Sequence, residues 1–300
     1  MCLFLGLAPT KDRGHSHGLQ PKANRKLCKR FSFALVRSQL PETSDKALLR
    51  EALRRDAAGT LYMAADLESP FFEQCRWLVE LEDARATAVV SAFFGLQTPS
   101  VLAAGNLDAL QRILRRYGPE LPVRFHTKLT NAQLGIFGDE YRFSDIEELD
   151  VMVLGEATQT TLPDGVEVRL IAPTDPVEPI LTLYRGYPGN FFERSQLQSG
   201  LYAGVWVGTA LAAIAGTHAY APGEGIAVLG NISTAERFRG QGHCRAVVAF
   251  LSTELKNRGC NLIGLHVAST NAPAIACYSN CGFKRHHSVY QMLAQKKHSL

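Results

Sequence analysis

The feature that most constrains this chain is a glycine-containing loop between an apolar run and a long amphipathic helix. The loop reads Arg-Phe-Arg-Gly-Gln-Gly-His-Cys over residues 237–244, and it follows the strand-like apolar run from Ile226 to Ile232. The helix that it opens ends at Gly259, with basic residues in its last turn. Because such a loop presents unpaired backbone N–H groups at the positive end of a helix dipole, the segment predicts an anion site that suits a pyrophosphate.

Other phosphate-binding motifs fit this segment poorly. A Walker loop requires Gly-Lys-Ser/Thr, which is absent, and a dinucleotide fingerprint needs a third glycine where Arg245 stands. Two glycines before a helix are also compatible with a plain loop-to-helix turn. The choice between an anion site and a plain turn therefore depends on the elements that follow the loop.

The segment after the loop helix supplies that context. A strand from Leu262 to Val267 leads to a short helix that begins at residues 271–273 and runs through Tyr278. Asn-Cys-Gly-Phe follows over residues 280–283, and then a final strand from His287 to Leu293. This arrangement resembles the GNAT superfamily of acyl-CoA-dependent N-acyltransferases. In that family the loop has the pattern Gln/Arg-x-x-Gly-x-Gly/Ala, and the last helix commonly reads Asn-x-x-Ala-x-x-x-Tyr-x-x-x-Gly-Phe. The matching positions are Arg239, Gly242, Cys244, Asn271, Ala274, Tyr278, Gly282 and Phe283.

The resemblance implies a set of cofactor-binding residues. The loop amides would hold the CoA pyrophosphate, and the strand that ends at Ile232 would pair with the pantetheine arm. The implied set is Ile232, Arg239, Gly240, Gln241, Gly242, His243, Cys244, Asn271 and Ala274. Cys244 departs from the usual Gly or Ala; it is small enough to be tolerated, at the cost of some crowding of the pyrophosphate or a slightly lower affinity.

The same resemblance implies that Tyr278 protonates the departing CoA thiolate. The attacking amine must be neutral, so it first loses a proton, directly or through water. Many relatives supply a carboxylate from the strand before the loop, but residues 225–234 contain none. The substitutes are His218, His266 and Glu224, of which His218 is preferred. A lone strand histidine is also compatible with a structural role, and a water relay is an alternative to any of the three.

The length of 300 residues predicts two domains. The turn residues 162–165 (Leu-Pro-Asp-Gly) mark the boundary. We expect a flexible basic extension over residues 1–42, a degenerate GNAT-like domain over residues 43–160 and a GNAT acyltransferase domain over residues 166–300. The predicted fold class is therefore α/β, with tandem GNAT-like domains that each have a mostly antiparallel mixed sheet flanked by helices.

The pattern of apolar residues predicts the elements of both domains. In the first domain we expect a helix over 45–56, a hairpin of 77–81 with 86–94, a strand over 101–104, a helix from 107 to about 118 and extended chain over 122–126. In the second we expect a strand over 166–171, a helix capped by Asp175, a short helix over 191–198, and three antiparallel strands over 201–207, 210–220 and 226–232.

Composition excludes several classes of function. The net charge of +4 is too small and scattered for a nucleic-acid-binding face, and no apolar run approaches the roughly eighteen residues of a membrane span. Seven irregularly spaced cysteines indicate a reduced, cytoplasmic protein, with Cys277 and Cys281 as buried apolar residues. His286 and His287 are adjacent and should point to opposite faces of a strand, exposed to solvent. We expect no metal site.

These observations favour an enzyme that moves an acyl group, by default from acetyl-CoA, to a primary amine by direct attack. The acceptor is a small molecule or a protein amine, and neither its identity nor the oligomeric state can be inferred. The alternative is a non-catalytic acyl-CoA-binding sensor or scaffold protein, which would need the loop but not Tyr278. A third interpretation, a regulator that binds an anionic macromolecule through the basic cluster at residues 25–30, has less support.

Overall fold

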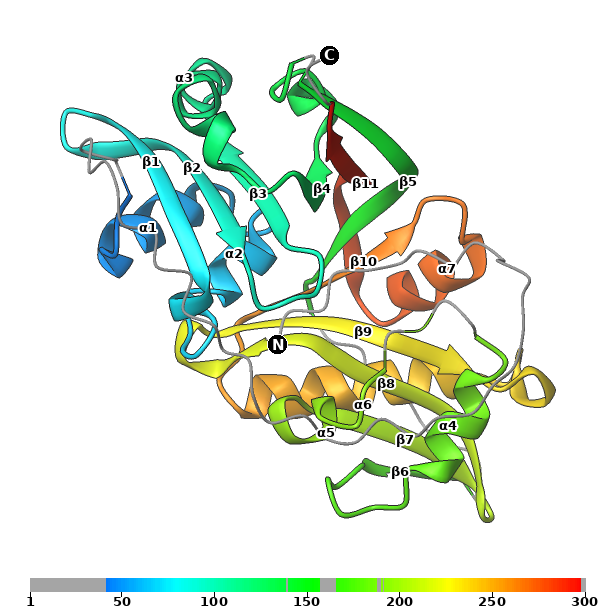
Figure 1. The fold of residues 1–300 in the computed structure, drawn as a ribbon. Helices are drawn as coiled ribbons and strands as arrows, with labels where there is room; N and C mark the ends of the chain where they lie inside the picture. Colours follow the sequence, from blue (N-terminus) through cyan, green and yellow to red (C-terminus); the bar gives the residue numbers. More distant parts are fainter. Residues whose placement is uncertain (1–41, 139, 157–165, 188–189, 191, 298–300) are drawn as a thin grey trace, which may run out of the picture.

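A computed structural model describes residues 42–138, 140–156, 166–187, 190 and 192–297. Its strands form one sheet of eleven, in the order β1-β2-β3-β4-β11-β5-β10-β9-β8-β7-β6 (Figure 1). We call residues 42–156 the front half and residues 166–297 the back half. The fold is thus a mixed α/β arrangement in which both halves share one continuous sheet.

The front half contains three α-helices and five strands among its described residues. They are α1 Lys46–Leu53, α2 Leu61–Ala65, β1 Cys75–Glu82, β2 Arg85–Phe93, β3 Ser100–Gly105, α3 Leu107–Tyr117, β4 Arg124–Leu129 and β5 Tyr141–Leu154. The back half begins with β6 Val166–Leu170, α4 Glu178–Tyr184, α5 Gln196–Ser199, β7 Tyr202–Val207 and β8 Ala210–Ala221. It continues with β9 Ile226–Thr234, α6 His243–Asn257, β10 Leu262–Ala268, α7 Ala272–Asn280 and β11 Phe283–Lys296.

Local sequence signals explain most of these elements. Asp83 and Ala84 adopt positive φ values at the turn of the predicted β1–β2 hairpin, which the structure confirms. Asn106 caps α3 by accepting a hydrogen bond from the Ala109 amide, as its polar side chain before an apolar stripe favours. The three predicted strands β7, β8 and β9 pair antiparallel.

The two halves exchange their longest strands. β5 of the front half lies between β10 and β11 of the back half, and pairs antiparallel with both. β11 in turn lies between β4 and β5, so it extends into the front half. Each of these strands has 14 residues, which is long enough to serve both parts of the sheet. The proposed division into domains near residue 160 therefore separates the chain but not the sheet.

The strand β5 also shows how the helices cover the sheet. Its Leu149 and Val151 join the core beneath α1 and α2, whereas Met152 and Leu154 join the core beneath α6 and α7. This alternation places the two helix pairs on opposite faces.

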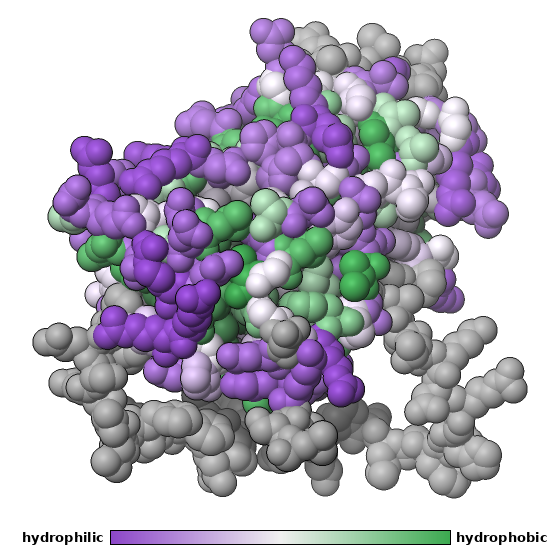
Figure 2. Space-filling model, turned by 90° about the horizontal axis from the view of Figure 1, so that it is seen from above, coloured by the Kyte–Doolittle hydropathy of each residue, from purple (hydrophilic) through white to green (hydrophobic). Residues whose placement is uncertain are grey.

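Seen from above, the molecule gathers apolar side chains in the middle of one surface, with hydrophilic side chains around them (Figure 2). Within the described ranges, no helix has the length and apolar character needed to cross a membrane.

Two expectations about elements need correction, and a third lies almost entirely outside the described residues. Asp175 does not cap a helix, because its carboxylate accepts hydrogen bonds from the Ala172 amide and from Arg169; α4 begins only at Glu178. The helix predicted over 191–198 is the single turn α5. The predicted basic extension lies outside the described residues, apart from Glu42, which forms an isolated bridge with β1.

Candidate functional site

The glycine loop has the backbone that an anion site requires. Gly240 and Gly242 have φ values of +74° and +81°, and a β-carbon at either would meet no atom within 4 Å. Gly242 takes the N-cap position of α6, where no side chain caps the helix. The first turn is closed by a hydrogen bond from the Ala246 amide to the Gly242 carbonyl, 3.0 Å long. The amides that precede Ala246 thus lie at an open, positive helix end.

Side chains around the loop add charge without covering these amides. Arg239 is exposed, and its Nε donates to the Thr234 carbonyl at 3.4 Å. Gln241 donates from Nε2 to the Arg237 carbonyl at 3.1 Å, which holds the loop closed on itself. The first turn of α6 contains no acidic residue, and Arg245 within it is exposed. The loop therefore combines backbone donors with positive charge.

Two residues that were predicted to bind the cofactor, His243 and Cys244, have side chains that are engaged away from the loop. His243 is 4% exposed and packs edge-on against Phe238, with ring centroids 5.8 Å apart; burial lowers the pKa of its imidazole. The Cys244 thiol interacts with Cys277 of α7 and packs in the core beneath that helix. The backbone amides of His243 and Cys244 remain able to serve the loop, and the position of the Cys244 thiol against α7 argues against its crowding a pyrophosphate.

β9 and β10 diverge next to this loop. Their parallel pairing runs from Ile226 opposite Leu262 to Leu229 opposite Leu265, and then stops. Asn231 follows with a φ of +51°, and its side chain donates to the hydroxyl of Tyr202 at 2.8 Å. This bend opens one edge of β9, on which half-buried Ile232 lies. An extended chain could bind the open edge as an added strand.

α7 brings the other predicted residues to the same region. Asn271 caps the helix by accepting from the Ala274 amide at 3.2 Å, so it has at least a structural role. Tyr278 is 7% exposed and packs against Phe283, with ring centroids 6.3 Å apart. Burial raises the pKa of its hydroxyl well above the usual value, which keeps it protonated at neutral pH.

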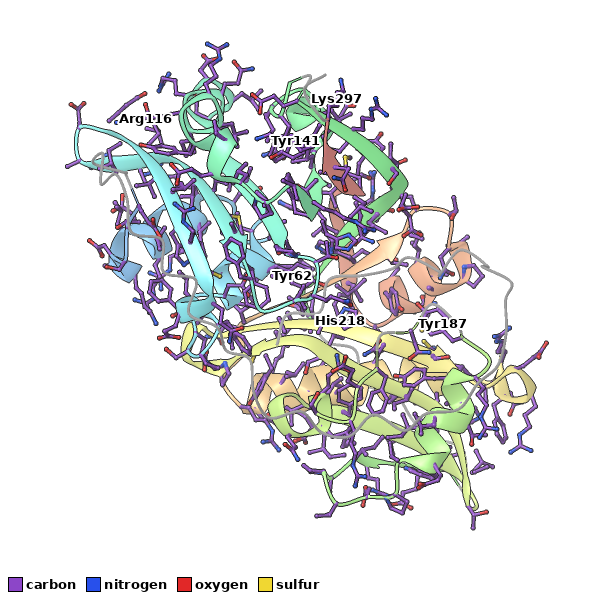
Figure 3. All side chains as sticks on the ribbon, viewed as in Figure 1. Tyr62, Arg116, Tyr141, Tyr187, His218 and Lys297 are labelled. Atoms are coloured by element: carbon purple, nitrogen blue, oxygen red, sulfur yellow. The ribbon has the colours of Figure 1, made fainter. Side chains whose placement is uncertain are left out.

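His218 lies on β8 directly against the point of divergence. A β-carbon on Gly230 of β9 would be 2.2 Å from the Cγ and Cδ2 atoms of its ring. The His218 Nε2 atom is buried and has no hydrogen-bond partner among the described residues. Burial lowers the pKa of His218 to about 4. The group is thus a neutral imidazole that interacts with the Asn231 side chain and has an unpaired Nε2. It lies in the band between the two halves, as do Tyr62 and Tyr187 (Figure 3).

The other two predicted bases are engaged differently. His266 on β10 accepts at Nδ1 from the Lys128 ammonium, 3.0 Å away, and burial lowers its pKa well below the usual value. Glu224 forms a two-bond ion pair with Arg50 of α1, at 2.6 and 2.7 Å. It precedes β9 at the end opposite to the divergence, so it is too far away to act there.

The structure adds a carboxylate that the sequence analysis missed, Glu147 on β5. Glu147 alternates with Leu149 and Val151, so it shares their face of the sheet. Val151 pairs with His266, which places Glu147 on the strand next to β10. Burial raises the pKa of Glu147, and the nearby charge of Lys128 opposes this only in part. It is therefore a stronger base than a solvated carboxylate.

Tyr187, which follows α4 and is 42% exposed, lies close enough to Glu147 and to Tyr278 to interact electrostatically with each. Burial and then the charge of Glu147 raise the pKa of the Tyr187 hydroxyl. Tyr187 is in turn one of the groups that raise the pKa of Tyr278. No motif could have revealed this cluster, because Glu147 reaches it only through the exchange of β5 between the halves.

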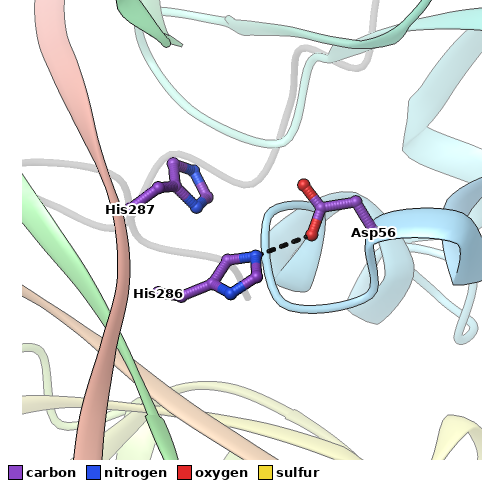
Figure 4. A group of neighbouring side chains, drawn as sticks. All are labelled: Asp56, His286 and His287. Atoms are coloured by element: carbon purple, nitrogen blue, oxygen red, sulfur yellow. Dashed lines mark hydrogen bonds and ion pairs between the residues drawn. The ribbon is translucent and has the colours of Figure 1, made fainter.

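The expectation that His286 and His287 point to opposite faces was wrong, whereas His286 is exposed as expected. The register between β5 and β11 shifts between Arg285, which pairs with Met152, and His287, which pairs with Val151. His286 is therefore the extra residue of a β-bulge, and it does not point away from His287 as in a regular strand. Both rings lie on the side of β11 that faces Asp56 (Figure 4).

Comparison with known proteins agrees with this geometry. Residues 171–283 match the family model of the acetyltransferase (GNAT) family. No curated protein sequence matches the chain. A structure of a Drosophila protein is similar to this chain with a TM-score of 0.65 and 12% identity, over 85% of this chain and 98% of its own.

Two further solved structures are similar over most of their length. A GCN5-related N-acetyltransferase from Kribbella flavida has a TM-score of 0.53 and 16% identity, over 83% of this chain and 97% of its own. A tandem GNAT protein from the clavulanic acid biosynthesis pathway has a TM-score of 0.53 and 13% identity, over 85% of this chain and 95% of its own. At such identities the likeness establishes the fold alone. The family match and the fold together support acyl transfer in general, and the C-terminal half of the chain has the fold of the GNAT superfamily.

Proposed function

We propose that this chain is an N-acyltransferase that moves an acyl group, acetyl in the simplest case, from acyl-CoA to a primary amine. The observation that carries the proposal is the open N-terminus of α6 beside the divergence of β9 and β10. The amides around Gly242 would bind the pyrophosphate, with Arg239 as a nearby cation. The pantetheine arm would lie along the open edge at Ile232, and Asn271 and Ala274 would flank it from α7.

The proposed reaction is a direct transfer. The amine nitrogen attacks the thioester carbonyl, a C–N bond forms, the C–S bond breaks, and the sulfur leaves with the electron pair. Tyr278 would then give its proton to the thiolate. Its raised pKa supports this role because the hydroxyl is protonated when needed. A CoA thiolate in the same buried region would also have a raised proton affinity, which would help to match the two groups.

We propose that His218 and Glu147 together remove the proton from the ammonium group of the acceptor. The free Nε2 of His218 can accept a hydrogen bond from the amine. An imidazole with a pKa of about 4 cannot hold the proton of an ammonium group, whose usual pKa is near 10. Glu147, with its raised pKa, is the better final acceptor on the same face. We propose that the proton moves from the amine to Glu147 through His218 or water.

The acceptor cleft is proposed at the junction of the halves. A cavity of about 360 Å³ is lined by Asp56, Tyr62 and Lys128 from the front half and by His266 and His287 from the back half. Clefts between structural units are common ligand sites. The front half would then contribute acceptor contacts without binding CoA, because its β3 runs directly into α3 and Asn106 already caps that helix.

The first test is binding of acetyl-CoA, measured by calorimetry and thermal shift. Gly242→Glu places a side chain and a negative charge in the proposed anion site. Gly208→Glu is a matched control, since Gly208 also has a positive φ, +59°, and open space, but lies in the β7–β8 turn. We expect wild type and Gly208→Glu to be stabilised by acetyl-CoA and Gly242→Glu to show no stabilisation. A folded wild type that binds no acyl-CoA would overturn the proposal.

The second test is turnover with a panel of amines. Loss of the Tyr278 hydroxyl in Tyr278→Phe should lower kcat by roughly 100-fold, a usual effect of removing a general acid, with acyl-CoA affinity unchanged. Glu147→Gln should also lower kcat, and less so at high pH, where more of the amine is already neutral. Tight acyl-CoA binding without transfer to any amine would instead favour the non-catalytic sensor or scaffold.

A further inference from the structure

A cluster of three potential metal ligands lies outside the proposed acyl-CoA site. His286 and His287 come from β11, and Asp56 ends the 3₁₀ turn η1 (Arg54–Asp56) after α1. One ligand atom from each residue lies within 4.8 Å of the other two. All three side chains gather in the space between β11 and the turn (Figure 4). Segments about 230 residues apart in the chain thus meet at one point.

The backbone of β11 makes this gathering possible. In a regular strand two consecutive side chains point to opposite faces and could not share an ion. The bulge at His286 removes this alternation, because His286 has no partner on β5. Bulges commonly re-aim side chains beside functional sites. The strand is therefore shaped so that both imidazoles reach the same side.

The turn that carries Asp56 orients the carboxylate toward these rings. Its Oδ1 accepts from the Gly59 amide at 3.0 Å and lies 2.9 Å from His286 Nε2. A β-carbon at residue 59 would be 2.2 Å from the Asp56 Oδ2 atom, so glycine leaves room for the carboxylate to fold over the turn. The backbone and the imidazole thus hold the same oxygen of the carboxylate, Oδ1.

The chemistry of the donors limits which ion they suit. Two imidazole nitrogens and one carboxylate oxygen form a ligand set that zinc uses when it keeps an open coordination position. Mg²⁺ and Ca²⁺ prefer sites made of oxygen alone. Asp56 and His287 also line the cavity of about 360 Å³, so water or a ligand in the cavity could fill the open position.

We propose that Asp56, His286 and His287 form a binding site for a divalent transition-metal ion of the zinc type. The ion replaces the hydrogen bond between Asp56 and His286 and adds His287. It joins the turn after α1 to β11 and so stabilises the contact between the front half and the exchanged strand. Asp56 and His287 also line the cavity proposed for the acceptor, but metal binding is measured without acyl transfer and can be tested by itself.

The test uses the full chain without an affinity tag, stripped of metal with a chelator and titrated with ZnCl₂ in a calorimeter. We expect one tight site, with Kd weakened by at least about tenfold in Asp56→Asn and in His287→Gln. Zinc should also raise the Tm of the wild type but not of these variants. MgCl₂ should give neither effect.

A control removes the histidines of the N-terminal segment. The double variant His15→Gln/His17→Gln should bind zinc as the wild type does. Zinc binding that is lost in this double variant, or kept in His287→Gln, would overturn the proposal. His287→Gln leaves the bond between Asp56 and His286 in place, so it separates loss of a ligand from damage to the fold. Its Tm without zinc should equal that of the wild type.

Discussion

The contact between Gly230 and His218 makes the best test of the geometry at the divergence of β9 and β10. In Gly230→Ala the added methyl would lie 2.2–2.3 Å from three atoms of the His218 ring. One of them is Cγ, which cannot move away without a change of rotamer or of backbone. Residue 230 has no positive φ, so the substitution introduces no backbone strain of its own.

The size of the effect follows from this contact. Overpacking of a filled site by one methyl usually costs about 1–3 kcal/mol. At about 2–4 °C per kcal/mol for a chain of this size, the Tm should fall by roughly 2–12 °C. Urea unfolding and differential scanning fluorimetry would measure both quantities. Gly135→Ala is the control, because a β-carbon there meets nothing within 4 Å and it should leave the Tm unchanged.

A double-mutant cycle identifies the cause. His218→Ala removes the ring atoms that the new methyl would strike, so the double variant should recover most of the lost stability. We expect a coupling free energy of at least about 1 kcal/mol between the two positions. If Gly230→Ala unfolds like the wild type, or if His218→Ala brings no recovery, the ring does not lie over Gly230 and the proposed role of His218 fails with it.

Two further predictions concern the strands that join the halves. Gly282→Ala should destabilise the chain by more than about 2 kcal/mol in urea unfolding, because residue 282 has a φ of +96° and its β-carbon would lie 2.0 Å from the Glu156 carbonyl oxygen; an unchanged midpoint would contradict this. Burial would raise the pKa of Asp150, but hydrogen bonds and the Arg285 charge outweigh it and hold the pKa below the usual value. This stabilisation is present above the unfolded pKa of about 3.9 and is lost as the pH falls through the folded value. Asp150→Asn should therefore lower the urea midpoint at pH 7 but not near pH 2, and equal losses at both values would refute the argument.

Local signals were sufficient for much of the fold. The β1–β2 hairpin, the helix α3 and the succession of β9, loop and α6 all follow from turn residues, caps and apolar periodicity within short segments. The signals for each of these elements lie within a short segment, although the residues that pack against it come from distant parts of the chain. Asp175 shows the limit of such signals, because the same carboxylate that can cap a helix binds Arg169 and the Ala172 amide instead.

Long-range pairing was beyond the sequence analysis. Nothing in the order of residues reveals that β5 leaves the front half and lies between β10 and β11. Glu147, which we propose as a base, was therefore overlooked, although the sequence shows that residues 225–234 contain no carboxylate. Glu224 was considered a candidate because the sequence does not reveal its ion pair with Arg50. That ion pair depends on how α1 packs on the back half.

The sequence by itself determined that a glycine-containing loop opens the helix α6 and that an apolar-flanked tyrosine lies on the helix that follows. Both depend on glycine conformations and apolar spacing, which are properties of the local chain. Only the tertiary structure decided which groups meet at those elements. The bulge at His286, the bend at Asn231 and the place of Glu147 arise from hydrogen bonds and packing between distant strands, whose energies no short segment contains.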